Sequence, residues 1–370
     1  MSNEIEVKAV RVVEFLGREK LDGVLLNAQH NFAWATGGGN NGVDQSRENG
    51  VASLLFGADG SRYVLANNIE IDRISMEELP TDSFEPISYS WQDEKASSEL
   101  IVERARSLVG KNVASDIILH SSIPAVESKF ASLRHQLTNE EKVRYRKLGS
   151  DAAEAFRKTI VAIKPGQNEL KIAATMRAEL GKVNAAAVVA LVAADERIKT
   201  YRHPLPTENV WQKTLMLVTC AKREGLIANL TRMVCAGDIS TELSDRTNAT
   251  AFVNAKLWAA TKPGISSREL YEVATSAYKE CGFENEINLH HQGGATGYRT
   301  RDWVAHPLGN EVVVRDQAFA WNPSITGTKV EETVFLNDNV LEAITLSPNA
   351  TTVDHTIDGV EYKVSGIVSV

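Results

Sequence analysis

Cysteine is scarce in this sequence of 370 residues, and its three cysteines, Cys220, Cys235 and Cys281, form no C-x-x-C pair. A disulfide scaffold and a zinc ribbon are therefore excluded, because both need several closely spaced cysteines. Long apolar runs are also missing, so no segment has the roughly 18 apolar residues of a membrane span. The charged opening segment 1–10 lacks the apolar core of a secretory signal. We expect a soluble, cytoplasmic protein.

An excess of basic residues is likewise absent, since 40 Lys and Arg stand against 48 Asp and Glu, for a formal charge of −8. Nucleic-acid binding relies on clustered Lys and Arg, so neither nucleic acid nor a membrane is expected as a partner. Hydrophobic residues make up 43% of the chain and charged residues 24%, which is ordinary for a globular protein. At about 100–200 residues per domain, the length predicts two domains.

The sequence patterns change near residue 137, which predicts a domain boundary there. Strand-like and helix-like segments alternate before this point: a strand at 21–28, a hairpin at 51–67, helices at 69–79 and 97–110, and a short strand at 112–119. An amphipathic helix follows over 137–160, and Ala-rich helices come after it. We therefore predict an α/β domain over 1–137 and a second domain over 138–370.

The second domain contains an internal repeat. Segments 162–174 and 260–274 share Lys-Pro-Gly, a polar spacer, Glu-Leu and a helical run, with the two triplets 98 positions apart. Pro-Gly favours a turn, and an acidic residue in the first helical turn is stabilised by the helix dipole. Strand-like sequence follows each copy, at 186–194 and at 287–291. The repeat predicts two related α/β halves.

Histidine provides the first candidate for chemistry. His203 lies in the polar, Pro-broken segment 200–212, immediately before a strand-like run at 215–221. Loops that are positioned by a strand often carry catalytic groups, which makes His203 a candidate general acid/base. An exposed loop histidine without a function is about equally compatible with this evidence alone.

The segment 289–303 is the most unusual in the chain, with adjacent His290 and His291 followed by three glycines within six residues. If the two histidines end a strand, they face opposite ways and cannot readily chelate one ion. Arg301 and Asp302 could bind a carboxylate or support a histidine. A Gly-rich connecting loop with chance histidines is the weaker alternative.

Two adjacent glutamates occur in the segment 319–336, which predicts two strands around a Gly turn. One of Glu331 and Glu332 should face inward, where a carboxylate needs a partner or a proton. Either is thus a candidate general acid/base, although two solvated glutamates at a sheet edge explain the pattern equally well. The pattern leaves open which of the two faces a pocket.

Together these segments resemble the pita-bread superfamily, peptidase family M24, which includes aminopeptidase P, prolidase, methionine aminopeptidase and creatinase. The resemblance spans essentially the whole chain and follows the family order of motifs: His203, NLTR (229–232), HHQGGATGY (290–298), WNP (321–323) and EET (331–333). It implies an α/β (α+β) fold class, with a creatinase-like N-terminal α/β domain and a C-terminal pita-bread domain of pseudo-twofold symmetry.

The resemblance also identifies where metal ligands should stand. The family's metallopeptidases hold two ions with Asp, Asp, His, Glu and Glu, and the matching positions here are Val218 or Thr219, Asn229, Gly294, Asn322 and Glu331. Only the last ligand is retained, and the replacements cannot supply the oxygen and imidazole donors that hard divalent ions prefer. We therefore expect neither a metal centre nor another cofactor.

Some further positions match the family's site. His203 and His290 correspond to site histidines, Arg301 stands where a third histidine is usual, and Asp302 stands where an acidic residue follows that histidine. Creatinase is a precedent for this fold working without metal, although creatine itself is not implied. The resemblance thus implies a metal-independent, creatinase-like hydrolase or lyase that acts on a C–N or related bond of a small polar molecule.

In this hypothesis His203 is the general acid/base, His290 assists it, and Glu331 orients it or binds a cationic part of the substrate. The expected substrate-binding residues are His291, Tyr298, Arg301, Asp302, Asn229 and Asn322. By family analogy the protein is a homodimer, in which the N-terminal domain of one subunit places Arg47 and Trp34 near the other's site. The alternatives are a non-catalytic pita-bread binding protein and an Xaa-Pro peptidase with an atypical metal site.

Overall fold

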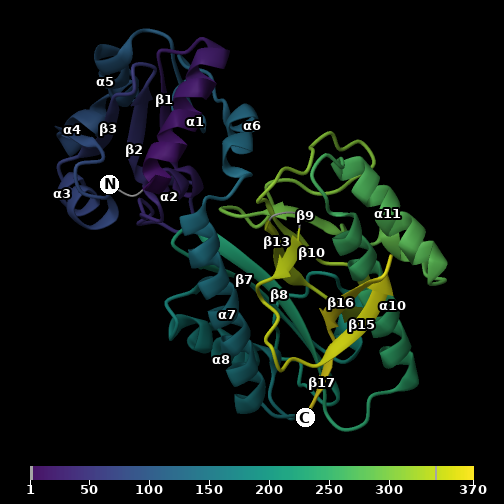
Figure 1. Ribbon diagram of the computed structural model, residues 1–370. Helices are drawn as coiled ribbons and strands as arrows, with labels where there is room; N and C mark the ends of the chain where they lie inside the picture. The colour runs from purple at the N-terminus through teal and green to yellow at the C-terminus, as the bar shows by residue number, and fades with distance from the viewer. Residues whose placement is uncertain (1–2, 338–339) are drawn as a thin grey trace. The chain divides into compact units, whose positions relative to one another are not determined.

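The computed structural model describes residues 3–337 and 340–370, which form two compact units (Figure 1). The first unit ends at Arg134 and also includes Thr138–Glu140, whereas the second comprises His135–Leu137 and Glu141–Val370. Among the described residues, no helix is both long and apolar enough to cross a membrane.

The first unit is built on a five-stranded sheet with the order β4-β3-β2-β1-β5. Its elements are α1 (Asn3–Glu19), β1 (Gly23–Ala28), α2 (Gln29–Thr36), β2 (Asn49–Gly57), β3 (Arg62–Asn67), α3 (Ile71–Arg73), the π-helical η1 (Ile74–Glu78), β4 (Glu85–Tyr89), α4 (Trp91–Ala96), α5 (Leu100–Val109), β5 (Val113–Ser115), α6 (Glu127–Phe130) and η2 (Ala131–Arg134). All six residues of β1 are buried, as expected for a central strand. The predicted α/β pattern is confirmed, including the β2–β3 hairpin.

The second unit contains two four-stranded sheets, with the orders β17-β8-β7-β6 and β14-β13-β10-β9. Its elements are α7 (Asn139–Ala162), α8 (Glu169–Gly181), β6 (Ala186–Ala194), α9 (Glu196–Thr200), β7 (Thr214–Arg223), β8 (Leu226–Cys235), α10 (Thr241–Ala260), α11 (Ser267–Glu280), η3 (Glu284–Asn288), β9 (Gly293–Thr296), β10 (Ala318–Trp321), β11 (Ser324–Ile325), β12 (Thr328–Lys329), β13 (Glu332–Asn337), β14 (Val340–Ala343), β15 (Thr352–Ile357), β16 (Val360–Ser365) and β17 (Ile367–Ser369). In Figure 1, α7 and α8 lie on one side of β7 and β8, and α10 and α11 lie on the other.

The predicted repeat within this unit is confirmed by matching backbone hydrogen bonds. In the first half, the N–H of Gly166 donates to the carbonyl of Trp211 (2.8 Å); in the second, that of Gly264 donates to Val313 (2.9 Å). Both glycines have a positive φ, of 91° and 97°, which a residue with a Cβ rarely adopts. In each half, therefore, the same kind of Pro-Gly turn is hydrogen-bonded to a loop.

The two four-stranded sheets of the second unit meet where β8 approaches the start of β13. The N–H of Thr231 donates to the carbonyl of Glu331 (3.1 Å), and the hydroxyl of Thr333 donates to the carbonyl of Asn229 (2.9 Å). These bonds fix the backbone at Glu331 against β8, so its side chain has a defined direction.

The prediction of a strand at 287–291 is wrong. The 3₁₀ helix η3 ends at Asn288, His290 and His291 lie in a loop, and β9 begins only at Gly293. A Cβ on Gly293 would lie 2.1 Å from the carbonyl oxygen of Ala320, so glycine permits the close approach of β9 and β10. The Gly-rich sequence therefore creates a short strand after the histidines.

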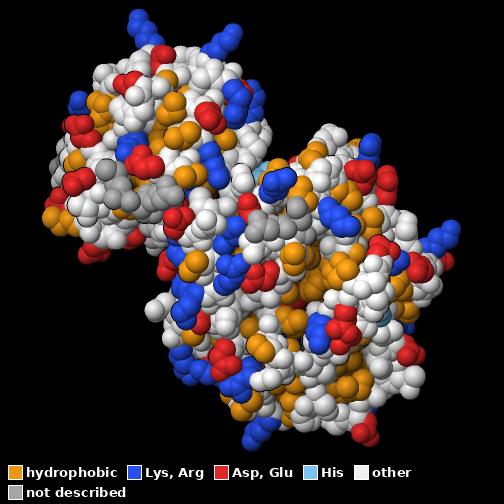
Figure 2. Space-filling model, in the orientation of Figure 1, with side chains coloured by type: hydrophobic (Ala, Val, Ile, Leu, Met, Phe, Trp, Pro, Cys, Tyr) orange, Lys and Arg blue, Asp and Glu red, His pale blue; other side chains and the backbone are white. Residues whose placement is uncertain are grey.

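On the face of the molecule that Figure 2 shows, charges of both signs are interspersed. Lys and Arg side chains alternate with Asp and Glu side chains over both units (Figure 2). The ion pairs include neighbours along helices, such as Lys147–Asp151 (2.9 Å) and Arg157–Glu154 (2.7 Å). Such exposed pairs contribute little to stability, about 0–1 kcal/mol each.

Candidate functional site

A cavity of about 520 Å³ in the second unit is lined by five of the eleven candidate residues: His203, His291, Arg301, Asn322 and Glu331. One wall is apolar and comes largely from β6 and β7, with Val188, Leu191 and Val218 among its residues. The other wall is polar and is formed by His203, His291, Thr300, Arg301, Asn322, Lys329 and Glu331. The cavity is thus amphipathic, and Arg177 on α8 adds a further charge to its lining.

Three histidines meet at this cavity. Nε2 of His203, in the loop after α9, lies 3.1 Å from Nε2 of His290, and the rings of His290 and His291 have centroids 4.6 Å apart. One nitrogen from each of the three lies within 4.8 Å of the others. The expectation that His290 and His291 face opposite ways is therefore wrong, because the strand alternation on which it depended is absent.

The electrostatics of the cavity favour neutral imidazoles. Burial lowers the pKa of His203 below its ordinary 6.5, and the positive charge of Lys329 lowers it further. The same two causes, in the same order, lower the pKa of His290 far below 6.5. Burial, followed by the charge of Arg301, lowers the pKa of His291 to about 4. All three imidazoles are therefore neutral at neutral pH.

A hydroxyl group lies behind the histidine pair. Nδ1 of His290 lies 3.2 Å from Oγ of Ser324, on β11. If the Nδ1–H of His290 donates to this hydroxyl, its Nε2 accepts from Nε2–H of His203; the opposite tautomers reverse both bonds. Ser324, which the sequence patterns did not single out, thus helps to orient the His290 ring.

The loop that carries His203 is anchored by a buried glutamate, Glu169. Its carboxylate accepts from the N–H and hydroxyl of Thr207 (both 2.9 Å), from the side chain of Asn209 (3.1 Å) and from the N–H of Ala194 (2.9 Å), and it pairs with Arg197. Burial raises the pKa of Glu169, but these bonds outweigh it and leave the pKa below 4.5. In the sequence this residue was visible only as the Glu of the Glu-Leu repeat.

Glu331 points to the cavity, and Glu332 points away from it. Glu331 accepts from the hydroxyl of Thr231 (2.9 Å) and pairs with Arg301 (2.9 Å) and Lys329 (3.0 Å). Burial raises its pKa, but the two cations outweigh burial and lower the pKa to about 2. Glu331 is therefore an ionised, paired carboxylate at neutral pH, which does not suit it to donate a proton.

Glu332 is also buried, so the alternative of two solvated glutamates at an edge is wrong. Its carboxylate pairs with Arg232 (2.6 Å) and accepts from the hydroxyl of Thr345. Neither partner lines the cavity that Glu331 faces. Glu332 thus serves the packing of the second unit rather than the cavity.

The residues at the family's ligand positions do not fit a dimetal centre. Val218 lines the cavity but is apolar, whereas the hydroxyl of Thr219 donates to the carbonyl of Val189 (2.8 Å). A Cβ on Gly294 would lie 2.1 Å from the carbonyl oxygen of Trp303, so the local backbone leaves no room for a side chain there. The one remaining carboxylate, Glu331, is already held by two cations. We derive no chemical step through a metal at this place.

Several predicted site residues lie elsewhere. Tyr298 is buried and its hydroxyl donates to Oε1 of Glu141 on α7 (2.8 Å), so the expectation that it lines the pocket is wrong. Asn229 donates to the hydroxyl of Thr296 (3.0 Å), behind the cavity wall. Asp302 also stands outside the lining residues, with its N–H bonded to the carbonyl of Ala295 (2.9 Å).

The two site residues predicted from the first unit, Trp34 and Arg47, differ in their exposure. Trp34 is fully buried in the core of that unit, where its ring packs edge-on against Phe130, so it cannot reach another subunit's site. Arg47 is exposed and pairs with Asp44 (3.1 Å). Its role across a dimer stays a prediction.

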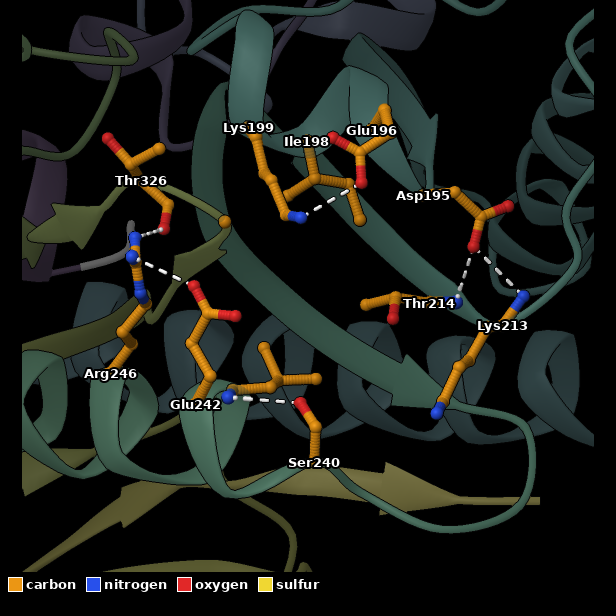
Figure 3. A pocket seen from close by; sticks show the side chains of 12 residues that line it. Asp195, Glu196, Ile198, Lys199, Lys213, Thr214, Ser240, Glu242, Arg246 and Thr326 are labelled. Carbon is orange, nitrogen blue, oxygen red and sulfur yellow. Dashed lines mark hydrogen bonds and ion pairs between the residues drawn. The ribbon is translucent and has the colours of Figure 1, made fainter.

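A second hollow, of about 300 Å³, lies near the N-terminus of α10 (Figure 3). Most of its charged groups have partners: Lys199 pairs with Glu196 (2.9 Å), Arg246 with Glu242 (2.9 Å), and Asp195 accepts from three backbone N–H groups of residues 212–214. Asp195 thereby fixes the corner between β6 and β7. The charges of this hollow serve the fold, in contrast to the histidines of the larger cavity.

Comparisons with known proteins agree with the fold described above. Residues 144–341 match the model of metallopeptidase family M24. An Xaa-Pro dipeptidase from Pyrococcus horikoshii is 20% identical over 354 residues, which cover 91% of this chain and 96% of that protein.

Solved structures show the same fold at low identity. Dipeptidase PepE from Mycobacterium ulcerans superposes with a TM-score of 0.78 at 15% identity, covering 99% of this chain and 98% of that one. An Xaa-Pro dipeptidase from Bacillus anthracis gives 0.74 at 15% identity, covering 99% and 100%. The N-terminal domain of the FACT complex subunit SPT16 from chickpea gives 0.68 at 11% identity, covering 92% and 96%.

The fold is therefore the α/β pita-bread fold, present over the whole chain. The chain belongs to metallopeptidase family M24, whose members are hydrolases.

Proposed function

We propose that this protein is a metal-independent, creatinase-like hydrolase or lyase that acts on a C–N or related bond of a small polar molecule. The observation that carries the proposal is the pair of imidazoles, with Nε2 of His203 and Nε2 of His290 3.1 Å apart at a cavity whose metal-ligand positions hold Val218, Asn229, Gly294 and Asn322.

His203 is the acid/base in this proposal, since it is exposed at the cavity and neutral at neutral pH. For hydrolysis, its imidazole takes a proton from water as the water oxygen bonds to the carbon of the C–N group. The imidazolium then returns that proton to the departing nitrogen as the C–N bond breaks. For elimination, the same imidazole takes the proton from the carbon next to the C–N carbon, the electrons of that C–H bond form a C=C bond as the C–N bond breaks, and the imidazolium gives the proton to the departing nitrogen. His290 holds the ring of His203 in place.

An Xaa-Pro peptidase with an atypical metal site is the second candidate, and one specific observation favours it. The three imidazoles offer nitrogens within 4.8 Å of one another, and a tetrahedral ion bound by three histidines keeps one position open for water. The charges of Lys329 and Arg301 oppose a dication there, because they already lower the affinity of these imidazoles for protons. The metal-independent function therefore ranks first.

The two candidates are separated by metal analysis combined with turnover assays. Purified protein is tested on Xaa-Pro dipeptides, guanidino compounds and small amides, with and without chelator, as wild type and as His203→Ala and His291→Ala. Activity that survives the chelator and is lost in His203→Ala supports the first function. Chelator-sensitive dipeptide cleavage that also requires His291 supports the second and refutes the first.

His120→Ala provides the matched control, because His120 is a partly exposed histidine of the first unit that bonds only its neighbour Ser122 (2.9 Å) among the described residues. It should leave all activity unchanged. A folded protein that turns over none of the three substrate classes would instead favour the non-catalytic alternative.

A further inference from the structure

The polar wall of the cavity carries an unbalanced positive charge. Lys329 and Arg301 both pair with the single carboxylate of Glu331, so this trio, in which Lys329 and Glu331 are buried and the Arg301 side chain is 13% exposed, keeps one net positive charge. Lys329 is 4% exposed and Glu331 is 2% exposed. A buried charge without a counter-charge is costly, which makes such a trio unusual unless a further anion completes it.

The hydrogen-bonding capacity of these side chains is also incomplete. The ammonium of Lys329 can donate three hydrogen bonds, yet among the described residues its side chain contacts only Glu331. Nε of Arg301 is buried without a partner in the same part of the chain. Both side chains line the cavity, so the missing acceptor can come from a bound molecule.

A third unsatisfied group is a hydrogen-bond acceptor that lacks a donor. Oδ1 of Asn322 is buried without a donor among the described residues, and Asn322 also lines the cavity. A ligand that satisfies all three groups needs an anionic acceptor and, close by, an N–H donor. The apolar wall, with Val188, Leu191 and Val218, provides contact for an uncharged remainder.

The second hollow offers a comparison within the same unit. Two of its cations, Lys199 and Arg246, each pair with a carboxylate of their own. With Lys213 and Asp195 included, the formal charges of its lining residues sum to zero. The surplus at Lys329 and Arg301 is thus a property of the larger cavity. Arg177, exposed among the lining residues of that cavity, adds a further positive charge.

We propose that Lys329 and Arg301 bind the carboxylate of the substrate, and that the substrate is a small acid with an amide- or urea-type N–H next to that carboxylate and an apolar remainder. The inference rests on the proposed function for its link to turnover, and it names the substrate class of that site. Glu331 holds the two cations in position rather than binding a cationic group.

Binding measured by isothermal titration calorimetry tests this proposal without turnover. The probes are N-benzoylglycine and its neutral amide, N-benzoylglycinamide, which share a shape and differ in charge. We expect the acid to bind at least tenfold more tightly than the amide, since a charge-assisted hydrogen bond contributes roughly 1.5–3 kcal/mol, or about 10–100-fold. Lys329→Met should remove most of this preference, Lys329→Arg should retain part of it, and Lys199→Met should leave it unchanged.

Equal affinity for acid and amide in the wild type, or an unchanged preference in folded Lys329→Met, would overturn the proposal. If Lys329→Met does not fold, the wild-type preference and its weakening at high salt decide the question. The titrations are repeated in His203→Ala. Acid preference that persists in His203→Ala shows that binding does not depend on the acid/base. Acid binding by a wild type that turns over none of the substrates supports the substrate class and counts against the proposed function alone; turnover that needs His203 but shows no preference for acids defeats the substrate class alone.

Discussion

Nζ of Lys329 lies 3.0 Å from Oε2 of Glu331, two residues further along the chain. Glu331 is the only residue of the family's metal-ligand set that this sequence retains, and the ammonium group occupies one side of its carboxylate while Arg301 occupies the other. Side-chain cations therefore neutralise the carboxylate that a metal ion would otherwise bind. Four predictions follow from this and neighbouring contacts.

Glu331→Gln should strongly destabilise the second unit. The substitution leaves Lys329 and Arg301 buried without a carboxylate, and breaking a buried ion pair costs about 3–5 kcal/mol. The free energy of unfolding from urea titration at pH 7 measures the loss. Glu342→Gln is the control, because its pair with Arg146 (2.8 Å) is half-exposed and should cost under about 1 kcal/mol. A loss of similar size in both variants would contradict the prediction.

The same carboxylate should contribute to acid denaturation. Its pKa is lowered in the folded state from 4.5 to about 2, so its contribution to stability is complete above pH 4.5 and is lost as the pH falls toward 2. The difference in unfolding free energy between wild type and Glu331→Gln should therefore shrink over this window. Urea titrations at steps between pH 6 and pH 2.5 test this, and a constant difference would show that the carboxylate is not involved.

Activity should persist below pH 6.5. Burial and Lys329 lower the pKa of His203, so its neutral, proton-accepting form remains dominant at pH values where an ordinary histidine is protonated. The logarithm of kcat/KM should therefore level off above a pKa that lies below 6.5, and fall below it. Removing the neighbouring charge in Lys329→Met should move this limb to higher pH. A limb that stays in place would mean that another group titrates.

Introducing a side chain at position 294 should destabilise the protein. A Cβ there would lie 2.1 Å from the carbonyl oxygen of Trp303 and 2.9 Å from Cα of Val304, so Gly294→Ala should cost at least about 1–3 kcal/mol and Gly294→His more. Thermal unfolding measures the cost. Gly181→Ala is the control, since no atom lies within 4 Å of its added Cβ. A stable Gly294→His variant that gains metal would disprove our account of this position.

Much of the fold could be predicted from the sequence, because its signals are local. The alternation of strands in the first unit and the repeated Lys-Pro-Gly segments depend on residues close together in the chain, and the turns at Gly166 and Gly264 form as their sequence indicates. The inward position of one glutamate was also predictable from strand alternation. Choosing Glu331 required the bond between its backbone and Thr231, 100 positions away.

The rest of the site depends on contacts that local patterns do not encode. Strand alternation was applied to His290 and His291, but η3 precedes them and a loop carries both toward His203. A lysine beside a turn is usually solvated, so nothing near Lys329 in the sequence indicates its burial. Tyr298 follows β9 directly, yet its hydroxyl bonds to Glu141, 157 positions earlier in the chain.

The Pro-Gly turns at Gly166 and Gly264 give the two halves the same backbone frame but different loops. In the first half this frame is closed by the N–H of Gly166, which donates to the carbonyl of Trp211, and the loop enclosed before Trp211 carries His203. Other residues hold this loop, because Arg202 donates to the hydroxyl of Thr326 (2.9 Å) and Thr207 and Asn209 donate to Glu169. A designer could therefore replace His203 alone and give the same cavity a different reactive group on an unchanged loop.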